Sequence, residues 1–344
     1  MADIKLIEKN GEILYLYDAK MCNPNGDPDD ENRPRMDLDR ERNLVSDVRL
    51  KRYIRDYLYD YFQENGGEQT IYVTKAEGVV NATERLKRLL GLGEKEQPTR
   101  EHLPTLLQKL VDVRLFGATM PVKGDRRGEG EAINLTGPVQ FNWGYSLNRV
   151  QLVESNTLSS QFASEADARQ GTFGKDYRLY YSFIAFHGII SARRAAVMYK
   201  LANENPAGAT SERDLELLDQ AMLKAIPLLA TRSKIGQYPR LYLRFEFTDA
   251  DTFMGDMRED LRLEPDTDLR SIQDVKLEIG GLKDRILEVK NRINRVFWWQ
   301  DRELTTQVNG SPKNCGEWLA ELLGSERVIP LRKGVKSRGQ YGRL

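Results

Sequence analysis

The sequence predicts an α+β fold in which two amphipathic helices pack against one β-sheet. Three observations lead to this prediction: a segment of β-forming residues at 12–19, a helical pattern that ends near residue 62, and a strand–helix–strand succession between residues 179 and 247. The predicted order is therefore strand, helix, strands, helix, strand, which is the order of a ferredoxin-like βαββαβ sandwich. The other segments are insertions into this frame.

The composition is that of a folded chain. Its 344 residues are 40% hydrophobic, which suffices for a core and predicts about two domains or one large domain with insertions. No apolar run is long enough to span a membrane, and the N-terminus enters a strand-like pattern without an apolar signal core. Cys22 and Cys315 are too few for a disulfide framework. We therefore expect a soluble, cytoplasmic protein with no membrane partner.

The first half of the chain gives three clear elements. Residues 12–19 predict a central strand, and the polar stretch 22–42, with three prolines, predicts a long loop. Asn43 or Ser46 can cap the first helix, which then runs to about Phe62.

The rest of the chain alternates predicted elements with insertions. Helical pieces are expected around 84–91 and 101–110, and strands at 71–73, 111–116, 137–143 and 179–190. The polar stretch 151–176 has too few apolar residues for a core, so it predicts a protruding hairpin. Ser211 begins a second amphipathic helix, 241–247 is a strand, 251–300 has helical apolar spacing, and 327–344 is a basic tail.

The first helix has an apolar face and a basic face. Lys51, Arg52 and Arg55 cluster opposite the apolar side chains, because they are three or four residues apart. The balance of 52 basic against 52 acidic residues argues against a nucleic-acid partner, but an anionic partner would turn the repulsion among these three cations into binding. The alternative is a solvated face with Asp47 and Asp56 as local partners.

Several blocks in this order resemble one protein family. They are Asn23–Pro28, Arg33–Arg35, Val45–Arg55, Asp112–Gly117, Gly137–Gly144 and His187–Ala192. In combination they resemble the backbone subunit of type I-B CRISPR Cascade complexes, a hand-shaped protein of the RAMP superfamily that binds CRISPR RNA. The resemblance spans residues 12 to about 245, and residues 251–344 carry no matching motif.

The resemblance implies a ferredoxin-like palm, similar to an RNA-recognition motif, with inserted finger and thumb. The expected domains are a palm at 1–63, 108–150 and 177–250, a helical finger at 64–107, a thumb hairpin at 151–176, and a C-terminal helical region with a basic tail at 251–344. Copies would assemble head to tail along CRISPR RNA and kink it at intervals, so that exposed guide bases pair with target DNA. Further implied partners are the large subunit, the small subunit, the 5′-end cap subunit and the RNA-processing endonuclease; no cofactor is implied.

The resemblance also implies RNA-binding residues. Lys51, Arg52 and Arg55 align with the phosphate-binding helix of the family, and Ser46 with a polar residue that contacts the RNA backbone. Met120 falls where an apolar residue supports the kink. The implied set is Arg35, Ser46, Lys51, Arg52, Arg55, Met120, Phe173, Lys175, Arg178, Arg232 and Lys234.

Simpler roles are open for many of these residues. Met120 and Phe173 are of a type that usually belongs to the core, and Ser46 suits a helix cap. Arg232 and Lys234 can complement a helix dipole. Two further residues, Asp112 and Arg114, are expected to be buried and structural. The cations of the tail fit either disorder or contact with nucleic acid: Arg327, Arg332, Lys333, Lys336, Arg338 and Arg343.

An acidic cluster in the first loop suggests an alternative function. Asp27, Asp29, Asp30 and Glu31 are of the type that holds Mg²⁺ for phosphodiester cleavage, and the related type III backbone subunits cut target RNA with a loop aspartate. The blocks match the type I pattern, whose backbone subunits are noncatalytic, so we expect no catalytic or metal site. A protein scaffold that binds no nucleic acid is the third possibility.

Overall fold

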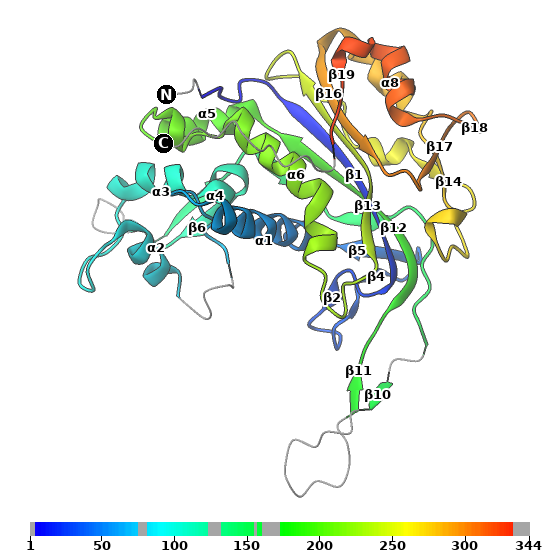
Figure 1. The fold of residues 1–344 in the computed structure, drawn as a ribbon, viewed down its shortest axis with the longest axis horizontal. Helices are drawn as coiled ribbons and strands as arrows, with labels where there is room; N and C mark the ends of the chain where they lie inside the picture. Colours follow the sequence, from blue (N-terminus) through cyan, green and yellow to red (C-terminus); the bar gives the residue numbers. More distant parts are fainter. Residues whose placement is uncertain (1–3, 75–80, 123–131, 155–156, 160–172, 333–344) are drawn as a thin grey trace, which may run out of the picture.

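One large sheet organises the molecule in the computed structural model, which describes residues 4–74, 81–122, 132–154, 157–159 and 173–332. Its strand order is β19-β16-β13-β1-β12-β9-β5-β4, and β8 also pairs with β12 (Figure 1). The strands are β1 (Gly11–Cys22), β4 (Met36–Asp37), β5 (Arg42–Val45), β8 (Val139–Phe141), β9 (Gly144–Ser146), β12 (Leu179–Ile190), β13 (Gln237–Phe247), β16 (Ile293–Gln300) and β19 (Val328–Pro330).

The centre of the sheet is antiparallel and is buried on both faces. Strand β1 pairs with β12 on one side and with β13 on the other. Alternate residues of β1, such as Tyr15 and Leu16, belong to the two different hydrophobic clusters that cover the faces. This double burial explains why the strand is an almost continuous run of β-forming residues.

Two long helices cover one face of the sheet. They are α1 (Asp47–Asn65) and α6 (Glu212–Leu228), and both lie on the same side of the sheet in Figure 1. The predicted caps are confirmed: the Ser46 side chain accepts a hydrogen bond from the backbone N–H of Arg49, and Ser211 accepts one from that of Asp214. A short helix, α5 (Ala192–Leu201), follows β12.

The C-terminal residues cover the other face, and the prediction of a helical region there is wrong. Their apolar side chains enter the second cluster from short turns and strands, and β16 pairs with β13 along the main sheet. Apolar spacing of three to four residues therefore reflects separate turns rather than one helix. The further elements are β14 (Arg262–Leu263), β15 (Lys276–Glu278), α7 (Leu282–Glu288), β17 (Thr305–Val308), β18 (Ser311–Pro312) and α8 (Cys315–Leu323).

The insertion after α1 has a small core of its own. The helices predicted near 84–91 and 101–110 are confirmed, whereas the strands predicted at 71–73 and 111–116 are wrong. Residues 111–116 form one helical turn that is buried all round, and burial on every side gives no helical period. The elements are α2 (Ala82–Leu90), α3 (Leu103–Lys109), α4 (Val111–Phe116), β6 (Gly117–Met120) and β7 (Ile133–Thr136).

Two short pairs of strands project at the end of the sheet. Strands β10 (Thr157–Ser159) and β11 (Phe173–Lys175) pair antiparallel away from the body, in agreement with the predicted hairpin; residues 160–172 lie outside the described part (Figure 1). In the long loop after β1, β2 (Gly26–Asp27) pairs with β3 (Arg33–Pro34). Within the described residues, no helix is both long and apolar enough for a membrane span.

Candidate nucleic-acid interface

Three segments that are distant in sequence meet where β1 ends. Because β1 is antiparallel to both neighbours, its C-terminal end lies beside the first residues of β12 and β13. Backbone hydrogen bonds join these segments: Lys20 donates to Gly236 over 2.8 Å, and Asn23 donates to Ser233 over 2.9 Å. The long loop, the base of the hairpin and the turn before β13 thus form one surface.

Arg178 is the brace of this surface. Its guanidinium donates two hydrogen bonds to Asp176, at 3.0 and 2.8 Å, and one to the carbonyl of Met21 at 2.7 Å. Asp176 also accepts a hydrogen bond from Arg232 at 3.0 Å, yet the Arg232 side chain is 70% exposed. Arg178 therefore ties the segments together, while Arg232 presents its charge to solvent.

Lys175 fixes the long loop against the hairpin. Its ammonium donates to both carboxylate oxygens of Glu31, at 2.9 and 2.7 Å, and the Tyr177 hydroxyl donates to the same group. These hydrogen bonds hold the pKa of Glu31 below its ordinary value, with that from Lys175 as the largest cause. The Lys175 side chain remains 53% exposed.

Lys234 is the most perturbed cation at this end. Its Nζ donates to the carbonyl of Asn23 at 2.5 Å. Burial lowers the pKa of Lys234 to about 8, and the positive charge of Arg49 lowers it further. The Arg49 guanidinium lies 4.0 Å from the centre of the Tyr53 ring. Sequence reasoning missed Arg49, although its i,i+4 spacing to Tyr53 was a signal.

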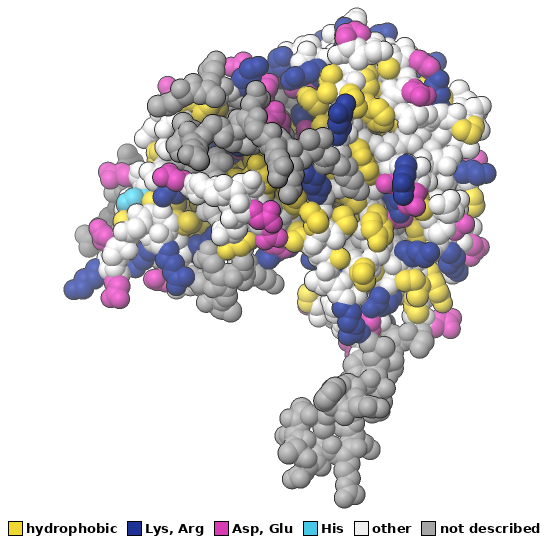
Figure 2. All heavy atoms as spheres, in the orientation of Figure 1, with side chains coloured by type: hydrophobic (Ala, Val, Ile, Leu, Met, Phe, Trp, Pro, Cys, Tyr) yellow, Lys and Arg dark blue, Asp and Glu magenta, His cyan; other side chains and the backbone are white. Residues whose placement is uncertain are grey.

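We refer to these five cations as the end cluster. Figure 2 shows Lys and Arg side chains gathered on the body beside the projecting segment at the bottom of the view. The cluster consists of Arg49, Lys175, Arg178, Arg232 and Lys234.

Arg35 and Ser46 lie together at the start of α1. The Asn25 side-chain oxygen accepts hydrogen bonds from the N–H and the hydroxyl of Ser46, both at 2.9 Å. The Arg35 N–H donates to the carbonyl of Asn25, and the guanidinium of Arg35 donates to Asp27 at 3.0 Å. The hydroxyl of Ser46 thus caps the helix and anchors the loop.

The prediction that Lys51, Arg52 and Arg55 form a free basic face is wrong. Lys51 pairs with Asp47 at 3.1 Å and Arg52 with Asp56 at 2.7 Å, as the alternative of local partners proposed. Arg55 pairs with Asp112 at 3.0 Å, and the side chains of Lys51 and Arg55 are only 11% and 12% exposed. This face of α1 packs against the insertion, because both cations also lie over the ring of Phe116.

Asp112 and Arg114 are buried as expected, but with different partners. Asp112 accepts hydrogen bonds from the N–H groups of Tyr72 and Val73, besides that from Arg55. Arg114 forms a two-pronged pair with Asp214 at 3.1 and 2.8 Å.

Of the two apolar candidates, Met120 has no exposed surface. It belongs to the small core of the insertion, so in the folded chain it offers no contact to a base. The predicted kink-supporting position is therefore a core position here. Phe173 lies in β11, and its side chain is outside the described part.

The acidic residues of the long loop have separate partners. Asp27 accepts hydrogen bonds from Arg35 and from the N–H of Asp29, Asp30 lies 3.7 Å from Arg33, and Glu31 binds Lys175. Within residues that the structure describes, no group of three or more His, Cys, Asp or Glu side chains is arranged to hold a metal ion.

The cations of the tail divide between the two parts of the chain. Arg327 donates to the carbonyls of Lys290 and Ile293, each at 3.2 Å. Arg332 is the last described residue, and Lys333, Lys336, Arg338 and Arg343 lie outside the described part.

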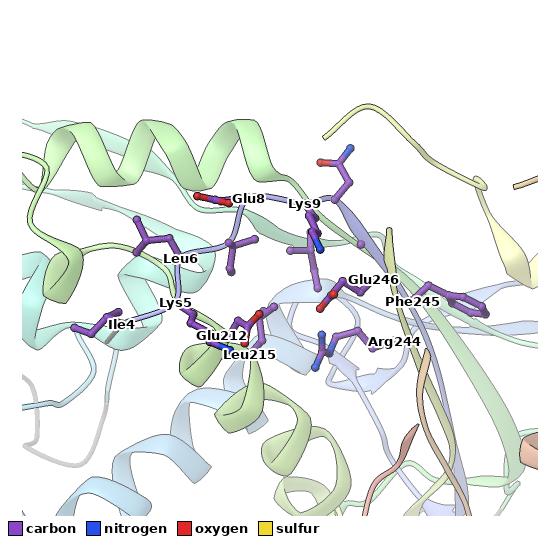
Figure 3. Close-up of a pocket in the computed structure, with 14 residues that line it drawn as sticks. Ile4, Lys5, Leu6, Glu8, Lys9, Glu212, Leu215, Arg244, Phe245 and Glu246 are labelled. Carbon is purple, nitrogen blue, oxygen red and sulfur yellow. The ribbon is translucent and has the colours of Figure 1, made fainter. Parts of the chain in front are cut away.

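A cavity of about 450 Å³ lies at the start of β1, away from the end cluster. Figure 3 shows the N-terminal segment, including Lys5 and Leu6, along one side of it, with Arg244 and Glu246 on β13. Arg244 pairs with the buried Asp219, and Glu246 pairs with Arg295 at 2.8 Å. These two charged groups of the cavity already serve pairs within the chain.

Comparison with known proteins identifies relatives of this chain. A family model described as "CRISPR-associated protein Cas7" matches residues 9–280. A curated protein of Haloferax volcanii (strain DS2) with that description is 34% identical over 333 residues, covering 90% of this chain and 92% of the relative.

Solved structures give weaker similarity. A "CRISPR RNA-guided surveillance complex" chain is 14% identical with a TM-score of 0.46, covering 88% of this chain and 95% of the other. A "CRISPR RNA-guided surveillance complex, pre-nicking" chain is 12% identical with a TM-score of 0.48, covering 92% of this chain and 100% of the other.

Proposed function

Because this chain belongs to the Cas7 family of CRISPR-associated proteins, we propose that it is a noncatalytic backbone subunit of a type I-B RNA-guided surveillance complex. Its partners would be CRISPR RNA, further copies of itself, the other subunits of the complex and, through guide pairing, target DNA. Guide bases rather than protein side chains would then recognise the target sequence.

The domain assignment belongs to the same proposal. A ferredoxin-like palm is supported by the antiparallel order β13-β1-β12-β8, with α1 following the first of these strands in sequence and α6 preceding the last. Residues 64–107 would be the finger and 151–176 the thumb, which would kink the RNA. Because Met120 is buried, the kinking role rests on the hairpin.

The end cluster is the observation that carries RNA binding. Arg232 and Lys175 are 70% and 53% exposed, and Arg178 holds their segments in place. Fixed, exposed cations from several segments suit a phosphate backbone, because they release counterions and carry no base preference. Arg35 and Ser46 would continue this track toward α1. The paired cations Lys51, Arg52 and Arg55 remain predicted contacts of lesser weight.

The absence of catalysis is proposed from the partners of the loop acids. Asp27 is engaged by Arg35, so its carboxylate stabilises the loop. Assembled complex incubated with complementary RNA and Mg²⁺ should leave that RNA intact. Regularly spaced cuts that disappear in Asp27→Ala or Asp29→Ala would instead establish the RNase alternative.

RNA that co-purifies with the chain tests the proposed function. The protein is expressed together with a CRISPR array and purified, and its absorbance ratio and the length of bound RNA are recorded. We expect assemblies that contain CRISPR RNA. A monodisperse protein without RNA under these conditions would contradict the proposal and favour the scaffold alternative.

A further inference from the structure

Trp143 is an exposed aromatic residue beside the start of α1. It lies in the turn between β8 and β9, and its side chain is 43% exposed. Strand β9 pairs with β5 so that Gly144 faces Val45, which places Trp143 next to Ser46. This position continues the surface formed by Ser46 and Arg35.

The backbone of Trp143 is held on both sides. Its N–H donates to the side-chain oxygen of Asn142 at 2.8 Å, and its carbonyl accepts a hydrogen bond from Arg258 at 2.6 Å. Arg258 is almost fully buried and is itself bound by Asp256. The indole is therefore displayed by a fixed turn, which lowers the ordering entropy that a ligand contact would cost.

A cation lies close to this indole. The Arg35 guanidinium is 5.7 Å from the centre of the Trp143 ring and is oriented by its hydrogen bond to Asp27. An aromatic ring beside a fixed cation matches one nucleotide, since the base can stack on the ring while its phosphate meets the cation.

We propose that Trp143 is a stacking platform for a base of single-stranded RNA, with Arg35 as the cation for the adjoining phosphate. This inference rests on the proposed function and adds a base contact to it. Stacking accepts every base, because each base has a π-face, so the contact suits a guide of arbitrary sequence.

Tryptophan fluorescence tests the contact directly, since a stacked base quenches the indole. The other tryptophans are Trp298 and Trp299, which are partly buried, and Trp318, which is 4% exposed. Single-stranded oligo(A) should quench the wild-type chain, and inorganic polyphosphate, which has no bases, should not. Trp143→Phe should remove the quenching, and Trp143→Ala should weaken oligo(A) binding about 5- to 150-fold.

Phe253→Ala is the matched control. Phe253 is 48% exposed, but it stands beside Asp249 and Asp251, so its loss should leave oligo(A) affinity unchanged. Equal quenching by polyphosphate, or quenching that survives in Trp143→Phe, would overturn the stacking contact. If the chain still co-purifies with RNA in that case, the proposed function stands without it. If the wild-type chain binds neither oligo(A) nor CRISPR RNA, both proposals fail.

Discussion

Two groups of cations in this chain have the same residue types and different surroundings. Lys51 and Arg55, on α1, are 11% and 12% exposed and face carboxylates supplied by their own helix and by the insertion. Lys175 and Arg232, in the end cluster, are 53% and 70% exposed although they also have acidic partners. The exposure of a cation, rather than the mere presence of a partner, separates a role in folding from a role on the surface.

The largest expected effect concerns the most deeply buried pair. Arg114→Ala should lower the free energy of unfolding by about 3–5 kcal/mol, because it leaves the charge of Asp214 buried without its partner. Arg232→Ala, in the end cluster, should change it by less than about 0.5 kcal/mol. Chemical denaturation of both variants measures the contrast, and similar losses would break the distinction between the two regions.

A smaller effect is expected for Arg55. Arg55→Ala should cost about 1–3 kcal/mol of unfolding free energy, because the fully buried Asp112 would keep only its two backbone hydrogen bonds. Arg52→Ala is the control on the same helix, since its i,i+4 pair with Asp56 is worth only about 0.3–0.5 kcal/mol. A loss in Arg55→Ala no larger than in Arg52→Ala would place both cations on a solvated face.

The pH dependence of RNA binding should reveal Lys234. Because burial lowers the pKa of Lys234 to about 8, its ammonium loses its proton, and its attraction for phosphate, as the pH rises through that value. RNA affinity measured from about pH 7 to about pH 9 should therefore fall, and Lys234→Arg, which keeps its charge, should flatten the profile. An identical fall in Lys234→Arg would assign the titration to another group.

The stability of the RNA-free protein should respond to the same group in the opposite sense. The pKa of Lys234 is lower in the folded chain than its ordinary value of 10.5, so the unfolded chain binds more protons between these values. The contribution of Lys234 to the free energy of unfolding should therefore rise with pH above about 8. Lys234→Met should remove this rise in denaturation experiments.

Local patterns predicted the frame of the fold. The caps Ser46 and Ser211 and the strand at 179–190 were found because capping and side-chain period are properties of adjacent residues. The partners of the cations were missed, since Arg55 and Asp112 are 57 residues apart and Arg114 and Asp214 are 100 apart. The strands of the C-terminal region were missed for the same reason, because β16 forms by pairing with β13.

For the candidate site, the sequence supplied residue types but not exposure. Lys175, Arg178, Arg232 and Lys234 were named in advance, and antiparallel pairing around β1 brings them together. Nothing in the sequence distinguished them from Lys51, whose helical pattern looked more convincing. Trp143 was noted only as part of a block, because exposure of one aromatic residue depends on the tertiary packing around it.

The salt dependence of RNA affinity tests most directly whether the end cluster carries the phosphate contacts. In a plot of log affinity against log salt concentration, Lys175→Ala/Arg232→Ala should reduce the slope by about 2, since each lost phosphate contact removes about 1. Lys51→Ala/Arg55→Ala, measured where it is folded, should reduce the slope by less than the first variant does. An unchanged slope in the first variant together with a large reduction in the second would contradict the account.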